Sequence, residues 1–134
     1  MTVELFVLRH GETTWNREGR MQGHLNAPLT PRGVAQANAQ RNIMAAHDLS
    51  AFRVLSSPSG RAVETAALAL GPLVTEIVTD PDLREIGVGD WTGRLRAELI
   101  DASEWQVTTD GVLELYDMAP GGEGLAGLEA RCTR

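Results

Sequence analysis

The chain begins with an apolar run that ends in an arginine and a histidine: Val3–Leu8 is followed by Arg9, His10 and Gly11. A nearly continuous apolar run closed by a glycine is typical of a buried strand in a parallel sheet. Open α/β sheets bind ligands beyond the carboxyl ends of their strands, where Arg9 and His10 would lie. Because neutral imidazole can act as a nucleophile and guanidinium can hold phosphate with two hydrogen bonds, the pair favours phosphoryl transfer through histidine. A histidine after a strand is nevertheless more often structural than catalytic, so further motifs must decide.

Four longer motifs carry more information. Arg9–Asn16 holds Arg-His-Gly-Glu-Thr and then Trp-Asn, and Gln22–Gly33 runs from Gln-Gly to Leu-Thr-Pro-Arg-Gly. Leu55–Ala66 contains Ser-Ser-Pro, Arg-Ala and Thr-Ala, and Leu83–Gly93 runs from Leu-Arg-Glu to Gly-Asp-Trp-Thr-Gly. In their kind and order these motifs resemble the histidine phosphatase superfamily, the phosphoglycerate-mutase-like proteins. The resemblance covers Val3–Gly93 and is specific.

Strands and helices are expected to alternate along the chain. Thr30 can cap a helix that begins at Pro31, and Ser57 can cap one that begins at Pro58. Expected strands cover 3–8, 52–55 and 74–78, a turn covers 80–82, and expected helices cover 31–47, 58–70, 94–105 and the residues from about 123. Such alternation gives a parallel sheet. We therefore expect one α/β domain over residues 1–134, a three-layer α/β/α sandwich with a mostly parallel sheet, as the resemblance also implies.

Composition argues against several classes of function. The 134 residues carry a net charge of −6, which is unfavourable for a broad nucleic-acid or membrane footprint. All 12 basic residues are arginines, so an anion site must use arginine, histidine or backbone N–H groups. Neither Cys132 nor the histidines His10, His24 and His47 have the spacing of a metal site. The first residues lack a basic segment and no apolar run reaches membrane length, so we expect a cytoplasmic protein.

The resemblance implies a role for each candidate site residue. His10 would attack phosphorus and carry the phosphoryl group, while Glu85 would protonate the leaving alcohol and then act as base for water. Arg9 and Arg61 would hold the phosphate oxygens, so neither a metal nor another cofactor is expected. The neutral hydrogen-bond donors would come from Asn16 and from the chain around Gln22 and Gly23.

Each of these residues also has a structural interpretation. Arg61 can be a surface arginine, although the first turn of a helix favours an anion rather than a cation. Glu85 can be an ordinary solvated carboxylate, and Asn16 and Gln22 can serve turns. Outside the site, we expect Trp91 to pack between a helix and the sheet, and His24 and His47 to be structural or exposed.

The chain departs from the family after its last expected helix. Family members continue into a strand that lies beside the first strand and ends in a second His-Gly motif, whereas this sequence stops at Arg134. The sequence is therefore either a truncated copy or a degraded relative with little activity, and the residues do not decide between these. An unfilled position beside the first strand leaves backbone groups that can recruit another chain, so a homodimer is one expectation.

Three classes of function remain. A phosphomonoesterase that hydrolyses a small phosphorylated metabolite through a phosphohistidine is favoured. A phosphoglycerate-type mutase, an isomerase, ranks second because the residues after Glu85 lead straight to Gly89 without a longer inserted lid. A non-catalytic module that binds a phosphorylated ligand or a protein ranks third, since only the missing second histidine supports it. Specificity would lie mostly in Asp101–Gly122.

Overall fold

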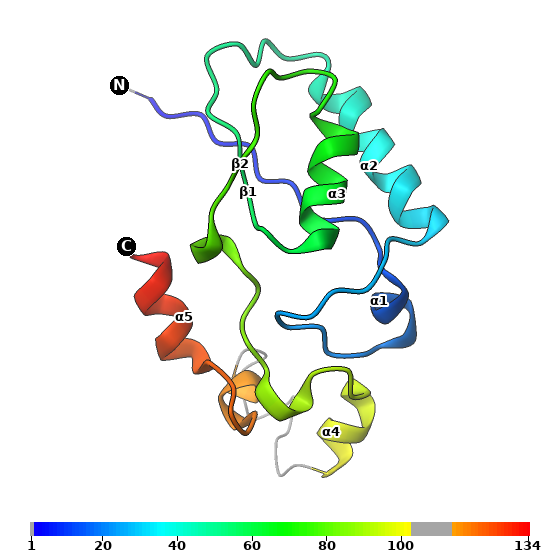
Figure 1. Cartoon of the computed structure of the whole chain (residues 1–134), viewed down its shortest axis with the longest axis vertical. Helices are drawn as coiled ribbons and strands as arrows, with labels where there is room; N and C mark the ends of the chain where they lie inside the picture. Colours follow the sequence, from blue (N-terminus) through cyan, green and yellow to red (C-terminus); the bar gives the residue numbers. More distant parts are fainter. Residues whose placement is uncertain (1, 103–113) are drawn as a thin grey trace.

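Two short strands and the helix between them form the α/β part of the molecule. The structure is a computed structural model that describes residues 2–102 and 114–134. Strands β1 (Leu55–Ser56) and β2 (Val78–Thr79) run parallel, and α3 (Gly60–Ala69) makes the crossover that a parallel pair requires (Figure 1). The predicted α/β class with parallel pairing is confirmed. Within the described ranges, both strands are shorter than expected and form the whole sheet.

Residues 3–8 form an extended segment, and the prediction of a buried strand here is wrong. Side chains on one face of the segment are 78–87% exposed: Val3, Leu5 and Val7. On the other face Phe6 packs on His47 and Phe52, with ring centroids 4.8 and 5.3 Å apart. A parallel strand is buried only when neighbouring strands flank it, and in the described part of the chain residues 3–8 make no backbone–backbone hydrogen bond.

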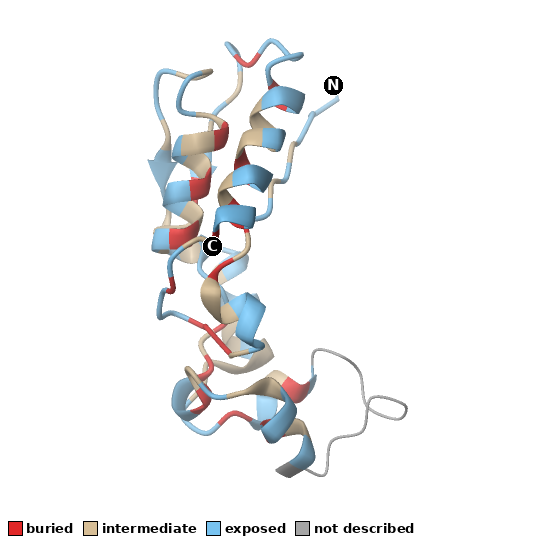
Figure 2. Cartoon of the chain, turned by 90° about the vertical axis from the view of Figure 1, so that its right-hand side faces the viewer, coloured by how far each residue is buried: buried red, intermediate tan, exposed pale blue. Residues whose placement is uncertain are grey.

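Helix α2 (Pro31–Met44) begins where the sequence predicts. The hydroxyl of Thr30 accepts a hydrogen bond from the amide of Gly33 at 3.1 Å, and Pro31 occupies the first position. The helix ends before the predicted His47. Figure 2 shows that buried residues of α2 and α3 lie on their facing sides. The buried residues of the two helices include the fully buried Ala37 and Ala69.

Helix α3 begins later than predicted, at Gly60 instead of Pro58. Ser57 does not cap it, because its hydroxyl accepts a hydrogen bond from the amide of Ser59 at 3.2 Å and so closes a turn before the helix. Ser59 takes the N-cap position without a side-chain bond to the helix. The helix ends at Ala69, close to the predicted end.

The expected elements of the second half are present with changed bounds. The turn expected at 80–82 becomes a 3₁₀ turn, and the helix expected over 94–105 begins at Arg96. Residues 103–105 of that helix lie outside the described residues, as do residues 103–113 of the range expected to set specificity. The elements not yet given are α1 (Thr14–Glu18), the 3₁₀ turns η1 (Pro81–Leu83), η2 (Gly89–Trp91) and η3 (Glu114–Met118), and the helices α4 (Arg96–Ala102) and α5 (Gly124–Cys132).

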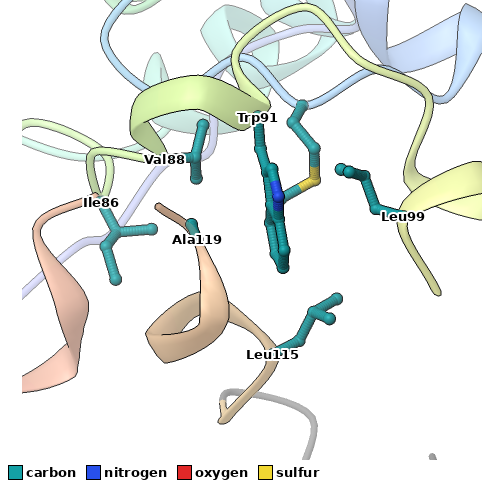
Figure 3. Close-up of a cluster of buried hydrophobic side chains, with 7 residues drawn as sticks. Ile86, Val88, Trp91, Leu99, Leu115 and Ala119 are labelled. Carbon is teal, nitrogen blue, oxygen red and sulfur yellow. The ribbon is translucent and has the colours of Figure 1, made fainter. Parts of the chain in front are cut away.

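Trp91 is buried, as predicted, but it packs in a cluster supplied by loops and short helices rather than between a helix and the sheet (Figure 3). Ile86 and Val88 belong to this cluster and follow the candidate residue Glu85, so the cluster anchors the chain just after that carboxylate. Within residues 2–102 and 114–134, no helix is long and apolar enough to span a membrane. Among the described residues, the buried members of the Trp91 cluster are Met21, Ile86, Val88, Trp91, Leu99, Leu115 and Ala119.

Candidate active site

A contact between two glycines sets the loop that carries the histidine. A Cβ atom on Gly11 would lie 2.3 Å from the carbonyl oxygen of Gly33, and one on Gly33 would lie 2.1 Å from the carbonyl oxygen of Glu12. The loop therefore approaches the first turn of α2 more closely than a side chain permits. The amide of Gly11 also donates to the hydroxyl of Thr65 on α3 at 3.0 Å. Two helices thus hold the loop immediately after His10.

The imidazole of His10 is half-buried and oriented by the backbone. Its Nδ1 lies 2.7 Å from the carbonyl oxygen of Gly11. Because a carbonyl oxygen only accepts hydrogen bonds, Nδ1 carries the proton and Nε2 of the neutral ring keeps its electron pair. Burial lowers the pKa of His10 below its ordinary value, and the positive charges of Arg61 and Arg9 lower it too, against the opposing effects of the Gly11 carbonyl and Glu85. At neutral pH the ring is therefore uncharged.

Arg61 is buried in the first turn of α3, so the alternative of a surface arginine is wrong. It is 2% exposed, and its Nη1 and Nη2 donate to the carbonyl oxygens of Leu25 and Gly23 at 2.8 and 2.9 Å. Its backbone amide donates to Oδ1 of Asn26 at 2.7 Å. Burial lowers the pKa of Arg61, and the negative charge of Glu85 opposes this. A guanidinium has five N–H groups, and the two side-chain bonds occupy two of them.

Glu85 is exposed, and its charge acts on both basic groups just described. One oxygen of its side chain accepts a hydrogen bond from the amide of the next residue, Ile86, at 2.9 Å. Its own carbonyl oxygen lies 2.8 Å from Nε2 of His24. His24 is exposed and contacts backbone, in agreement with the prediction, and His47 is exposed as well.

Asn16 and Gln22 meet on the hydroxyl of Thr13 rather than on His10. The hydroxyl lies 3.0 Å from Oδ1 of Asn16 and 2.9 Å from Oε1 of Gln22. Asn16 also completes the capping box of α1, since its Oδ1 accepts from the amide of Thr13 at 3.0 Å. The structural interpretation of Asn16 is therefore realised. In both side chains the oxygen faces Thr13, so the NH₂ group is directed away from it.

A groove of about 640 Å³ brings four of the seven candidate residues together: Arg9, His10, Arg61 and Glu85. Asn16, Gln22 and Gly23 are not in its lining; Gly23 instead supports Arg61 through its carbonyl oxygen. Most of its other lining residues are apolar and come from the extended segment, from residues 49–55 and from α3. Among the residues that the structure describes, no group of three or more histidine, cysteine or carboxylate side chains could hold a metal ion.

Sequence reasoning did not assign Ser57 and Ser59 to the site, yet both line the groove. Their hydroxyl oxygens lie 3.2 Å apart just before α3. The signal was present in the Ser-Ser-Pro-Ser sequence, which we used as part of a family motif and, at Ser57, as a helix cap, without assigning either hydroxyl to the site. Hydroxyls before a helix add hydrogen-bond donors where the helix already favours an anion.

A neutral imidazole and two arginines in the lining of one groove, on an α/β fold with parallel strands, indicate an α/β protein whose site suits a phosphate group. The chain belongs to the histidine phosphatase superfamily, branch 1, whose family model matches residues 5–134.

Known proteins are similar over most of this chain. The phosphoglycerate mutase-like protein 4 of Arabidopsis thaliana is 37% identical over 136 residues, which cover 98% of this chain and 57% of that protein. The adenosylcobalamin/alpha-ribazole phosphatase of Escherichia coli K12 is 37% identical over 98 residues, 73% of this chain and 47% of that protein. The solved structure of Bacillus stearothermophilus YhfR has a TM-score of 0.76 at 36% identity, with 93% of this chain and 61% of that chain covered. The chain thus spans about half to three fifths of the length of these relatives.

Proposed function

We propose that the protein is a phosphomonoesterase that hydrolyses small phosphate esters through a phosphohistidine intermediate. One observation carries the proposal: Nδ1 of His10 donates to the carbonyl oxygen of Gly11, which leaves Nε2 as the free base of a residue that lines the groove. Nε2 attacks phosphorus, the bond from phosphorus to the ester oxygen breaks, and His10 carries the phosphoryl group. Water then attacks phosphorus, which releases inorganic phosphate and restores the neutral ring.

Arg9 and Arg61 supply the positive charge of this reaction. Both line the groove with His10, and the exposed guanidinium of Arg9 complements the buried one of Arg61. Fixed charges of this kind need little reorganisation as negative charge shifts onto the ester oxygen in the transition state. We propose that the NH₂ groups of Asn16 and Gln22 donate hydrogen bonds to the phosphate as uncharged donors. Gly23 contributes by fixing the position of Arg61 through its carbonyl oxygen.

Glu85 is proposed as the group that moves the proton. In the first step its carboxylic acid protonates the leaving alcohol, and in the second its carboxylate takes a proton from the attacking water. Its exposed position at the groove suits this role because alcohol must leave and water must enter there.

A phosphomutase is the second candidate, supported by the name of the Arabidopsis relative. The hydrolase is supported by the burial of the residues directly after Glu85, since Ile86 and Val88 pack in the Trp91 cluster rather than over the groove. A mutase must shield its phosphorylated intermediate from water, and these buried residues give no such cover.

We further propose that residues 1–134 form one domain, that the protein is cytoplasmic, and that it acts without a metal. We also propose a homodimer, since the backbone of the extended segment at residues 3–8 makes no backbone–backbone hydrogen bond within the described residues and can pair with a second copy.

The experiment that tests the proposed function is hydrolysis of p-nitrophenyl phosphate and of small alkyl phosphates in the presence of EDTA. Metal-independent release of phosphate supports the proposal. Complete loss of activity in EDTA, or mutase activity stimulated by 2,3-bisphosphoglycerate that exceeds hydrolysis, contradicts it.

A further inference from the structure

An ion pair joins the two ends of helix α5. Glu123 precedes the helix and Arg131 is in its last turn, and their side chains are 18% and 10% exposed. Nε and Nη2 of Arg131 donate to the two carboxylate oxygens of Glu123, the second at 3.0 Å. The hydrogen bond from Arg131 lowers the pKa of Glu123, and the bond to Glu123 raises the pKa of Arg131, so both groups are charged near neutral pH.

Glu123 and Arg131 also make hydrogen bonds to the backbone around Glu85. Nη1 of Arg131 donates to the carbonyl oxygen of Asp82, and Nη2 donates to that of Glu85 at 3.1 Å. The carboxylate of Glu123 accepts from the amide of Gly87 at 3.0 Å, and the amide of Glu123 donates to the carbonyl oxygen of Gly87 at 2.8 Å. The backbone is thereby held before, at and after Glu85.

These contacts fix the backbone from which the carboxylate of Glu85 projects. Its side chain is exposed and accepts a hydrogen bond from the adjacent amide of Ile86, which itself belongs to the held segment. A carboxylate anchored to its own backbone takes its position from that backbone. Misplacing a reacting group by about 1 Å can cost on the order of 100-fold in rate.

We propose that Glu123 and Arg131 are positioning residues that hold Glu85 at the groove for proton transfer to the leaving group. The inference rests on the proposed function and adds to it two residues that act through Glu85 rather than on the substrate. A purely structural ion pair would slow all substrates alike when broken. A positioning pair acts through the proton transfers of Glu85, and of these only the transfer to the leaving group differs between substrates.

The test compares Arg131→Gln with Arg134→Gln in the full chain. Arg134 is a matched control because it lies just beyond α5 and pairs with the side chain of Asp82 at 2.6 Å, but it is 66% exposed. We expect Arg131→Gln to lower kcat/KM for an alkyl phosphate, which reports formation of the phosphohistidine and not its later hydrolysis, by about 10-fold to 100-fold. For p-nitrophenyl phosphate, whose phenolate leaves without a proton, we expect less than about a twofold change. Arg134→Gln should change neither rate.

A double variant separates positioning from general damage. In a Glu85→Gln background, the further change Arg131→Gln should have no effect on the alkyl phosphate, because the group that it positions is already lost. An equal decrease of kcat/KM for both substrates, or full additivity with Glu85→Gln in kcat/KM, overturns the inference. If Arg131→Gln does not fold, Arg131→Lys, which keeps the charge but not the paired geometry, is compared in the same way.

A measurement without turnover distinguishes failure of this inference from failure of the proposed function. Amide hydrogen exchange of Gly87 should become faster by about 10-fold or more in Arg131→Gln, and stay unchanged in Arg134→Gln, because local opening follows the loss of local bonds. If exchange at Gly87 becomes faster in Arg131→Gln but the parent protein has no phosphatase activity, the proposed function is refuted. The finding that Arg131 holds the backbone around Glu85 is then retained. Unchanged exchange overturns the inference whatever the activity.

Discussion

Arg61 donates a hydrogen bond from Nη2 to the carbonyl oxygen of Gly23 at 2.9 Å. This bond joins the start of α3 to the loop that carries Gln22, and the bond from Nη1 to Leu25 strengthens the join. The arginine proposed to bind phosphate is therefore also a structural residue. Its buried position fixes the guanidinium before a ligand arrives, which is the property that electrostatic stabilisation requires.

The double role of Arg61 gives the first prediction. Arg61→Ala leaves two carbonyl oxygens without their charged donor, so it should lower the free energy of unfolding by about 2–4 kcal/mol. Urea unfolding measures this. Arg61→Lys should recover part of the loss, because an ammonium lacks the fork that reaches both carbonyls. A loss below about 0.5 kcal/mol for the alanine variant, the size of ordinary surface effects, would contradict the structural role.

The second prediction concerns Gly33. Alanine is ordinarily better than glycine inside a helix by about 1 kcal/mol. At Gly33 a Cβ atom would lie 2.1 Å from the carbonyl oxygen of Glu12, so Gly33→Ala should instead destabilise the protein by about 1–3 kcal/mol and displace the loop after His10.

Thermal unfolding and hydrolysis of p-nitrophenyl phosphate check the Gly33 variant together. The control is Gly19→Ala, since a Cβ at Gly19 meets nothing within 4 Å and only its φ of +74° is unfavourable. That variant should cost about 1–2 kcal/mol and keep its activity. A Gly33→Ala protein that is more stable than the parent would show that the close approach to Glu12 is absent in solution.

The third prediction is the pH dependence that follows from His10. Its folded-state pKa is lowered, chiefly by burial, so the unfolded chain binds the proton more readily than the folded one. The contribution of this group to stability is therefore complete above its unfolded pKa, about 6.5, and is lost as the pH falls through the folded pKa. Urea unfolding of parent and His10→Gln protein between about pH 7 and pH 4 measures it, and the parent should lose more stability. Parallel curves would contradict the burial of the ring.

The fourth prediction concerns Glu85. If it protonates the leaving group, Glu85→Gln should lower kcat/KM, which reports formation of the phosphohistidine, by about 100-fold or more for alkyl phosphates and far less for p-nitrophenyl phosphate, because only a strongly basic leaving oxygen needs the proton. Steady-state rates with both substrates measure the difference. An equal change in kcat/KM for the two would remove Glu85 as the acid of the first step, and Glu12 would then be the next carboxylate to test.

Local chemistry in the sequence predicted the parts of this fold that depend on neighbouring residues. The start of α2 is an example, because the hydroxyl of Thr30 and the ring of Pro31 act within one turn. Burial of the segment at residues 3–8 could not be predicted in this way, because it depends on strands contributed from elsewhere. Ser57 failed as a cap for a local reason: its hydroxyl binds the amide of Ser59 instead.

In the candidate site, too, short motifs predicted single residues, whereas contacts between distant residues were not predicted. Motifs indicated His10, Arg61 and Glu85, and the groove brings them together. The bond between Arg61 and Gly23 and the bond between Arg131 and Glu85 were not predicted, since they join residues 38 and 46 positions apart and carry no short-range pattern. Such contacts follow from the packing of α3 and α5 rather than from composition.

The most direct test of the account is a rapid acid-and-base quench of the protein with labelled phosphate ester. The phosphohistidine mechanism predicts one labelled residue, His10, in an adduct that acid destroys and base preserves, and His10→Ala should abolish the label while the protein stays folded. Label that persists in His10→Ala, or that is found on Ser57 or Ser59 as a base-labile ester, would contradict the central claim that His10 is the nucleophile.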